Sequence, residues 1–339
     1  MKRIPTREAA GHVLCHDMTQ IIPGRYKGAR FRKGHVVREE DIPVLLSMGK
    51  EHLYVWELVP GMVHENDAAE RLCALCRNEG MERSAVQEGK IELTAARDGL
   101  FQVDSRRLNA VNALENLMIA TRHGGTAVRK GDKLAGTRVI PLVIEEETLR
   151  RAEAAAGERP LLELLPWKLK TAAVVTTGSE VAQGLIEDAF TPVVEKKLAE
   201  FGIRMIGHRL PGDDMEAVTE AILAARRSGA DLILCTGGMS VDPDDNTPGA
   251  VKRSGADIVA YGAPVLPGAM FLLGYFEDGT PIVGLPGCVM YAKRTIFDLV
   301  LPKLAAGVPV TREDLTTLGE GGLCLGCEVC TYPNCGFGK

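Results

Sequence analysis

The sequence predicts an α/β protein in which residues 166–306 form a mostly parallel sheet flanked by helices, preceded by a β-rich, α+β half. From Leu169 onward, apolar strands alternate with helical segments of about 10–15 residues, which is typical of a parallel sheet with right-handed crossovers. Residues 89–147 instead alternate short apolar runs with glycine-containing turns. Between these two patterns lies the segment 150–168, charged and alanine-rich and then bounded by prolines, where we place the main domain boundary.

Composition excludes several classes of protein. The chain has 339 residues, of which 45% are apolar and 25% charged, with a net charge of −5. This length suits two or three domains with a sizeable core. Without a basic excess, nucleic acid is not an expected partner. No signal peptide or membrane-spanning run is recognisable, so we expect a cytoplasmic protein with no membrane contact.

The N-terminal half divides into two expected parts. Residues 1–58 read as a small α+β unit, with a helix over Glu39–Met48 and a strand over His52–Leu58. Residues 59–165 form a second, β-rich domain, with helices expected over Asp67–Arg77 and Ser105–Thr121. Cys73 and Cys76, one helical turn apart beside apolar residues, are expected to be a buried structural pair.

The third domain, 166–306, carries the strand–helix alternation. Thr191 and Pro192 predict a helix start, as N-cap and first helical residue, and Asp213 with Glu216 has the spacing of a capping box. A last helix is expected from about Val289 to Leu304. Four strands are expected here: Thr171–Thr177, Ile203–Leu210, Asp231–Cys235 and Pro281–Leu285.

Three of these strands end in glycine turns, which read TTGSE (Thr176–Glu180), CTGGMS (Cys235–Ser240) and GLPGC (Gly284–Cys288). Ligands of an open parallel sheet lie outside the carboxyl ends of its strands. Glycine lets backbone N–H groups approach an anion, and serine and threonine hydroxyls add donors. The sequence therefore predicts a site for a phosphate-bearing ligand. It contains neither a dinucleotide fingerprint nor a P-loop.

Three aspartates follow the second turn: Asp242, Asp244 and Asp245. Carboxylates beside a phosphate repel it unless a cation lies between them. Mg²⁺ suits such a place, because it takes one or two carboxylates and shares phosphate oxygens. The alternative is that one aspartate acts as a general base or a transient ligand.

Residues 169–305 resemble the molybdopterin-binding domain shared by molybdenum-cofactor biosynthesis proteins of the MoaB/Mog and MoeA type. The matching segments read TTGSEV, GLIED, HRLPGDD, ADLILCTGGMSVDPDDNTP and IVGLPG. The resemblance implies a MoaB/Mog-like fold, molybdopterin (a pterin dithiolene phosphate) as ligand, and Mg²⁺. It also implies either adenylylation of molybdopterin or insertion of molybdate. A β-rich half that precedes this domain makes the layout MoeA-like.

By motif position, the resemblance assigns the site residues. The predicted cofactor-binding residues are Thr177, Gly178, Ser179, Glu180, Thr236, Gly237, Gly238, Pro286 and Gly287. Asp245 and Ser240 are the predicted catalytic residues, and Asp242 and Asp245 the predicted Mg²⁺ ligands. The expected partners are molybdopterin or its adenylylated form, and molybdate, and we expect a homo-oligomer.

A departure from the family pattern leaves alternatives open. The insertion enzymes carry a lysine in a Pro-Gly-Lys-Pro segment that here reads PGAM (Pro267–Met270). Ser240 and Asp245 favour an enzyme resembling a molybdopterin molybdenumtransferase or adenylyltransferase. The missing lysine favours a non-catalytic carrier or sensor, which would dock a client molybdoenzyme through its cysteine tail. A third reading is a pterin- or nucleotide-binding protein of another pathway.

The last residues, 307–339, form a cysteine-rich tail. Cys324, Cys327, Cys330 and Cys335 follow a C-x₂-C-x₂-C-x₄-C spacing. Four thiolates this close can bind one tetrahedral metal ion or one iron–sulfur cluster, and the sequence leaves both Zn²⁺ and the cluster open. The alternative is a flexible, redox-sensitive tail. Cys288, after the third glycine turn, either faces the dithiolene or is a small core residue.

Overall fold

The structure is a computed structural model that describes residues 2–22, 25–56, 60–240 and 245–339. The chain forms two compact units. The first comprises Met1–Arg97, Val103–Gly124 and Lys130–Leu164, and the second comprises Asp98–Gln102, Gly125–Arg129 and Leu165–Lys339. In the described part of the chain, no helix has both the length and the apolar character needed to cross a membrane.

The N-terminal part of the first unit is a small α+β arrangement around its own apolar cluster. Its elements are β1 (Lys2–Pro5), β2 (Met18–Ile22), β3 (Tyr26–Phe31), α1 (Ile42–Ser47) and β4 (His52–Val55). Strand β1 pairs with β4, and β2 pairs with β3, both antiparallel. Leu14, Leu45 and Leu53 are almost fully buried in the cluster.

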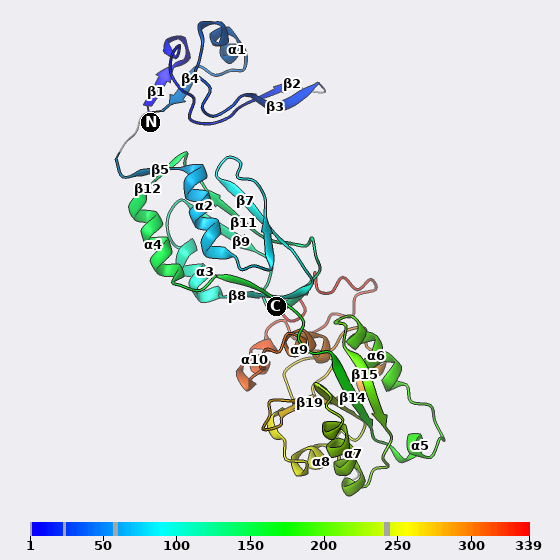
Figure 1. Cartoon of the computed structure of the whole chain (residues 1–339). Coiled ribbons are helices and arrows are strands. Elements are labelled where there is room, and N and C mark those ends of the chain that lie inside the picture. The colour runs from blue at the N-terminus through cyan, green and yellow to red at the C-terminus, as the bar shows by residue number, and fades with distance from the viewer. Residues whose placement is uncertain (1, 23–24, 57–59, 241–244) are drawn as a thin grey trace. The chain divides into compact units, whose positions relative to one another are not determined.

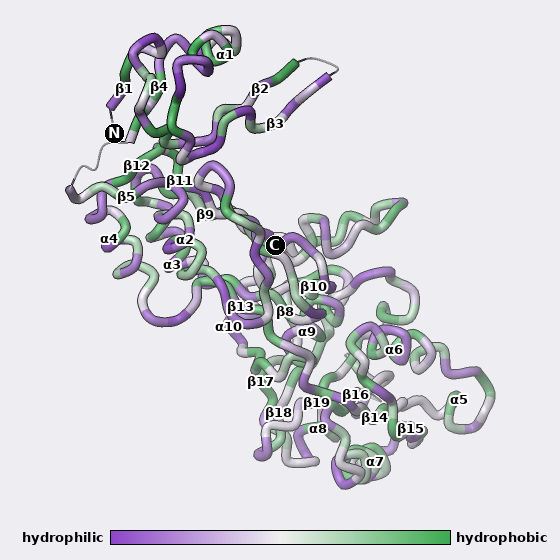
Figure 2. Tube along the Cα trace, turned by 45° about the horizontal axis from the view of Figure 1, so that its top comes forward, coloured by the Kyte–Doolittle hydropathy of each residue, from purple (hydrophilic) through white to green (hydrophobic). Residues whose placement is uncertain are grey.

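The rest of the first unit is β-rich, as expected. Its elements are β5 (Met62–His64), α2 (Glu65–Cys76), β6 (Met81–Arg83), β7 (Lys90–Ala95), α3 (Ser105–Asn112), β9 (Leu117–Thr121), β11 (Lys133–Val139), β12 (Val143–Glu145), α4 (Glu146–Ala156) and β13 (Leu162–Leu165). Four strands form a sheet in the order β6-β7-β11-β9. Helices α2 and α4 alternate between hydrophilic and hydrophobic along their turns, as helices with one buried face do (Figure 2).

Two expectations for this half were wrong. The helix expected over Ser105–Thr121 ends at Asn112, and β9 follows because it pairs with β11. The side chain of Asn112 bonds to both backbone groups of Ile119 at 2.8 Å, which fixes the turn between helix and strand. The segment 150–168 does contain the division between the two units, after Leu164, but it is not only a linker. It also contains most of α4 and all of β13, because the buried faces of these elements pack inside the unit.

The second unit contains a six-stranded sheet in the order β15-β14-β16-β19-β18-β17. Figure 1 labels β14, β15 and β19 of this sheet. Its strands are β14 (Thr171–Thr176), β15 (Arg204–Arg209), β16 (Leu232–Thr236), β17 (Asp257–Tyr261), β18 (Leu272–Tyr275) and β19 (Pro281–Leu285). Strand β18 alone runs antiparallel to its neighbours, so the mostly parallel sheet is confirmed. The β17–β18 hairpin was not expected from the sequence.

Helices cover both faces of this sheet. They are α5 (Ser179–Ala182), α6 (Phe190–Ala199), α7 (Met215–Arg227), α8 (Thr247–Arg253), α9 (Ile296–Ala305) and α10 (Arg312–Thr316). Alternate residues of the strands face two separate cores. Val174 and Leu234 pack against α6 and α9, whereas Val175 and Ile233 pack against α7 and α8. The unit also holds β8 (Gly99–Val103) and β10 (Thr126–Val128), which pair antiparallel.

Helix starts in this unit differ from the expected ones. Helix α6 begins at Phe190, and the backbone N–H groups of Phe190 and Thr191 donate to the carboxylate of Asp188, at 2.8 and 3.1 Å. Asp214, not Asp213, caps α7. The last expected helix is a 3₁₀ turn over Gly287–Met290 followed by α9, whose first turn is closed by a capping box.

The cysteine tail packs on the second unit. Leu323 forms a β-bridge with Leu266, and the hydroxyl of Tyr332 donates to the backbone carbonyl of Asp298 at 2.8 Å. Phe337 is 5% exposed and belongs to the core formed around α9. The tail is therefore part of the packed unit, although it contains neither a helix nor a strand after Gly319.

Candidate functional site

The carboxyl ends of β14, β16 and β19 meet at one edge of the sheet, because the three strands are adjacent, parallel and in register. Thr176 is aligned with Thr236, and Thr236 with Leu285. The three glycine turns therefore start side by side, as the motif spacing predicts. This edge is the usual ligand-binding position of an open parallel sheet.

The first two turns interlock. The backbone N–H of Thr177 donates to the carbonyl of Thr236 at 2.8 Å, and the hydroxyls of Thr177 and Thr247 lie 3.3 Å apart. A Cβ at Gly237 would lie 2.4 Å from the carbonyl oxygen of Thr177, and one at Gly238 would lie 2.7 Å from Oγ1 of Thr247. Both glycines also have positive φ. The fold alone therefore requires glycine at these two positions.

A cavity of about 470 Å³ opens at this edge of the sheet. It lies between the second turn, the third turn and the segment before β18. Its lining residues are Phe190, Gly237, Gly238, Met239, Ser240, Asp245, Gly268, Ala269, Met270, Leu285, Pro286, Gly287, Cys288, Met290 and Tyr291. The volume is in the range of small-molecule and cofactor sites.

Gly287 differs from the glycines of the second turn. A Cβ added there would meet no atom within 4 Å, and φ is not positive. The residue is exposed and lines the cavity. Neither backbone strain nor a close contact within the fold therefore demands glycine, and the bare backbone faces the space that a ligand would fill.

Ser240 and Asp245 lie together at the cavity. The backbone N–H of Ser240 donates to Oδ2 of Asp245 at 2.7 Å. The hydroxyl of Tyr261 donates to the carbonyls of Met239 and Ser240 at 2.9 and 3.2 Å. Burial, and to a lesser extent the charge of Asp245, raises the pKa of Tyr261, so this phenol stays protonated as a donor.

Charge in the cavity is sparse. Among the described residues that line it, Asp245 is the one carboxylate, and none is Lys or Arg. Asp242, the other predicted Mg²⁺ ligand, and Asp244 lie outside the described residues. In the part of the chain that is described, no three His, Cys, Asp or Glu side chains are arranged to hold a metal ion.

Several predicted residues are placed away from the cavity wall. The backbone N–H of Ser179 donates to Oδ2 of Asp213 at 2.8 Å, and Gly178, Ser179 and Glu180 lie at α5, where they do not line the described cavity. Thr236 is fully buried, and its hydroxyl donates to Oγ1 of Thr176 at 3.0 Å. Their roles in ligand binding stay predictions.

Sequence reasoning missed much of the cavity wall. Met239, Met270, Met290 and Tyr291 line it, and Tyr291 is 79% exposed. Met239 and Met270 lie within the quoted segments CTGGMS and PGAM, but no periodic pattern marks any of the four as lining a cavity, because they come from turns rather than from regular elements. Cys288 lies at the cavity, and burial raises the pKa of its thiol, so the thiol stays protonated at neutral pH.

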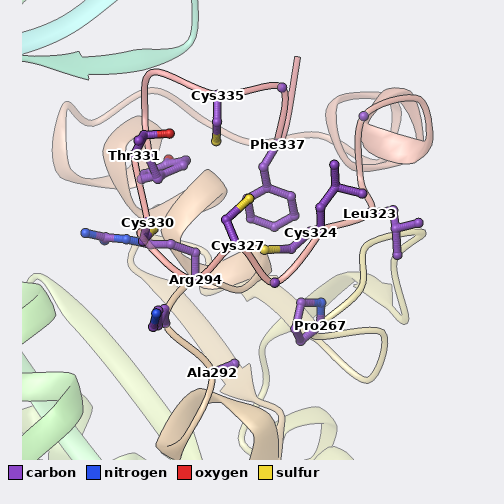
Figure 3. A pocket seen from close by; sticks show the side chains of 16 residues that line it. Pro267, Ala292, Arg294, Leu323, Cys324, Cys327, Cys330, Thr331, Cys335 and Phe337 are labelled. Atoms are coloured by element: carbon purple, nitrogen blue, oxygen red, sulfur yellow. The ribbon is translucent and has the colours of Figure 1, made fainter.

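The remaining cysteines fall into two groups. Cys73 and Cys76 are buried in α2, and burial raises the pKa of Cys76 to about 12, so the expected structural pair is confirmed. The four tail cysteines line a second cavity, of about 400 Å³ (Figure 3). Cys324 and Cys335 are partly buried, whereas Cys327 and Cys330 are exposed.

Taken together, a doubly wound α/β unit with glycine turns and a cavity at the carboxyl edge of its sheet is a small-molecule binding domain. Its residues 173–306 match the family described as "Probable molybdopterin binding domain". The expected resemblance is thus confirmed, and the chain contains a molybdopterin-binding-type domain. Residues 3–57 match a domain of unknown function.

Curated relatives match this part of the chain. A molybdopterin molybdenumtransferase of Staphylococcus epidermidis is 31% identical over 124 residues, which cover 34% of this chain and 29% of that protein. A CinA-like protein of Thermosipho melanesiensis is 30% identical over 86 residues, covering 25% and 21%. The chain thus matches less than a third of the length of either relative.

Among solved structures, this chain is similar to the molybdopterin biosynthesis enzyme MoaB of Thermus thermophilus. It is 22% identical, with a TM-score of 0.34, over 42% of this chain and 99% of that one.

Proposed function

We propose that the second unit binds molybdopterin in the cavity at the end of the sheet, and that the protein acts in molybdenum-cofactor biosynthesis in the cytoplasm. The observation that carries the proposal is the exposed backbone of Gly287, which the fold does not require to be glycine and which faces the cavity. The family match over 173–306 and the molybdenumtransferase relative support the same ligand.

Each part of the ligand has a place in this cavity. The phosphate would meet bare backbone at Gly287 and the hydroxyl of Ser240, since glycine turns at strand ends suit anions. The flat pterin would lie against the thioether and ring surfaces of Met239, Met270 and Tyr291. Volume fits as well, because about 470 Å³ accommodates a small cofactor.

Mg²⁺ fits one side of the cavity. Asp245 supplies a carboxylate beside the expected phosphate position, and Mg²⁺ is commonly held by one or two carboxylates together with substrate phosphate oxygens. The ion would compensate the repulsion between Asp245 and the phosphate. Asp245 also accepts the N–H of Ser240, so the carboxylate is already oriented by the loop.

Whether the protein is a transferase or a carrier depends on how negative charge in the cavity would be stabilised. Adenylylation or molybdate insertion develops negative charge that enzymes usually stabilise with Lys, Arg or a metal ion. No Lys or Arg is found among the described lining residues, so such stabilisation would fall to Mg²⁺ at Asp245. A carrier or sensor that docks a molybdoenzyme needs no such charge, and this observation favours it as the second candidate.

The experiment that tests the proposal is mass spectrometry of the small molecule released from protein purified under anaerobic conditions. We expect molybdopterin, or its adenylylated form, in near-stoichiometric amount. Incubation of the loaded protein with ATP, Mg²⁺ and molybdate then separates the two candidates, since a transferase converts the ligand and a carrier returns it unchanged. A different ligand, such as a nucleotide, would refute the proposal.

A further inference from the structure

The four tail cysteines surround one cavity. Cys324, Cys327, Cys330 and Cys335 come from a single segment that loops around a space of about 400 Å³ (Figure 3). Pro267 and Arg294, from other parts of the chain, also line it. Four thiols around one cavity can act together as a ligand set, whereas the structural cysteines Cys73 and Cys76 are buried in a helix.

The arrangement distinguishes a cluster from a single ion. A zinc ion with four thiolates at about 2.3 Å draws their sulfur atoms to about 3.8 Å from one another and leaves no space between them. In the described chain no three Cys, His, Asp or Glu side chains are arranged to hold a single metal ion. The thiols instead line a void far larger than an ion. We propose that this void is the binding site of a four-iron, four-sulfide cluster with one thiolate on each iron.

Charge around the cavity supports an anionic occupant. A cluster core of charge +2 with four thiolates carries a net charge of −2. Arg294 lines the cavity, lies over the ring of Tyr332 at 5.0 Å and is oriented by Asp298 at 2.8 Å. Lys293 also lines it, and its Nζ donates to the carbonyl of Glu328 at 2.7 Å. On ligation the thiol protons would pass to solvent.

The backbone that carries the thiols is anchored before the ligands are bound. The N–H of Cys324 donates to the carbonyl of Leu266 at 2.8 Å, and Tyr332 and Phe337 pack on the core around α9. Cys330 and Cys335 lie on either side of Tyr332. The fold therefore holds the backbone on both sides of the exposed cysteines Cys327 and Cys330.

The cluster site adjoins the cavity at the sheet edge. Pro267 and Ala292 line the cysteine cavity, while the residues next to them, Gly268 and Tyr291, line the other. The same two short segments thus separate the two spaces within one unit. A cluster placed here would share its walls with the pterin site of the proposed function, although the inference rests on the cysteines alone.

Anaerobic reconstitution of the full chain with Fe²⁺ and sulfide tests the proposal. We expect about four irons and four acid-labile sulfides per chain, a visible absorption band and an electron paramagnetic resonance signal after reduction. Cys327→Ser and Cys330→Ser, at exposed positions that the fold does not need, should each lose at least half of the iron. Cys73→Ala, which leaves all four tail thiols in place, is the matched control and should load like the wild type.

Three outcomes would overturn the proposal: stoichiometric zinc without sulfide, no metal at all, or full loading of the Cys327 and Cys330 variants. Circular dichroism of each variant shows that the fold is retained, so that lost iron is not the result of unfolding. Pterin content measured on the same samples distinguishes the outcome for the cluster site from the outcome for the pterin site. Iron without pterin supports the cluster site and refutes the proposed function. Pterin without iron supports the proposed function and refutes the cluster site.

Discussion

At the residue scale, the three glycine turns look alike in the sequence but differ in the structure. Gly237 is held by its contact with the carbonyl of Thr177, and Gly238 by its contact with Thr247. Gly287 has no such contact. A motif marks the turn, but only the folded chain shows which glycine is needed for packing and which leaves room for a ligand.

We predict that Gly287→Val weakens molybdopterin binding at least tenfold and changes the free energy of unfolding by less than about 0.5 kcal/mol. The new side chain would occupy ligand space and meets no atom of the protein within 4 Å at its Cβ. Gly136→Val in β11 is the matched control, because Gly136 has an equally open Cβ position in the other unit. Ligand titration measures the effect, and equal affinities of the two variants would exclude Gly287 from the site.

Asp245 has two separable functions, and two variants distinguish them. Asp245→Asn keeps an oxygen acceptor for the N–H of Ser240 but loses the charge, so we expect it to fold normally and to bind ligand without dependence on Mg²⁺. Asp245→Ala should in addition lose about 1 kcal/mol of stability with the hydrogen bond. Titration of ligand with and without Mg²⁺ is the measurement. Unchanged Mg²⁺ dependence in Asp245→Asn would show that Asp245 serves only as the acceptor for the N–H of Ser240.

At the scale of elements, the alternation of strands and helices in residues 166–306 was predictable, because buried strands and amphipathic helices have distinct periods. The ends of the helices were less predictable from the sequence. Thr191 and Pro192 resemble a helix start, yet Asp188 caps α6, since it reaches two free N–H groups from a position outside the helix. Strand β9 was read as helix because its pairing with β11 is a long-range contact that local propensity does not contain.

Asp188 should make stability depend on pH. Burial raises its pKa, but hydrogen bonds from Thr191 and Phe190 and the charge of His208 outweigh burial, and the net shift is downward. A lowered folded-state pKa gives stability that is present above the ordinary value of about 3.9 and is lost as the pH falls through the folded-state value.

The variants of Asp188 separate charge from hydrogen bonding. Asp188→Ala should cost about 1 kcal/mol at neutral pH, through loss of the cap. Asp188→Asn keeps an acceptor, so its stability should be closer to that of the wild type at neutral pH and fall less on acidification. Urea unfolding at a series of acid and neutral pH values measures both. Parallel stability curves for the Asp188→Asn variant and the wild type would contradict the assignment.

At the scale of the whole molecule, the sequence predicts the four tail cysteines and the turn residues at the sheet edge as binding residues, but not the residues that surround them. The spacing of the four tail cysteines is local, whereas the cavity they line also depends on Pro267 and Arg294, distant in the chain. The same holds at the sheet edge, where Met270 and Tyr291 complete the wall. Such contacts follow from packing between elements, which motif spacing does not encode.

The cysteine tail packs into the core of the second unit, and this packing leads to a prediction on stability. Phe337 is 5% exposed in the core around α9, so Phe337→Ala should lower the free energy of unfolding of the second unit by about 3–5 kcal/mol, as truncations of buried aromatic residues do. Val329→Ala is the control, because Val329 lies in the same tail but is 75% exposed, and it should change stability by less than about 0.5 kcal/mol. Denaturant unfolding of the metal-free chain measures the contribution of packing to the free energy of unfolding without any contribution from metal binding. If both variants unfold like the wild type, the tail does not contribute to the core of the second unit. A loss of unfolding free energy confined to Phe337→Ala shows that the tail completes this core and, through it, holds the thiols in place.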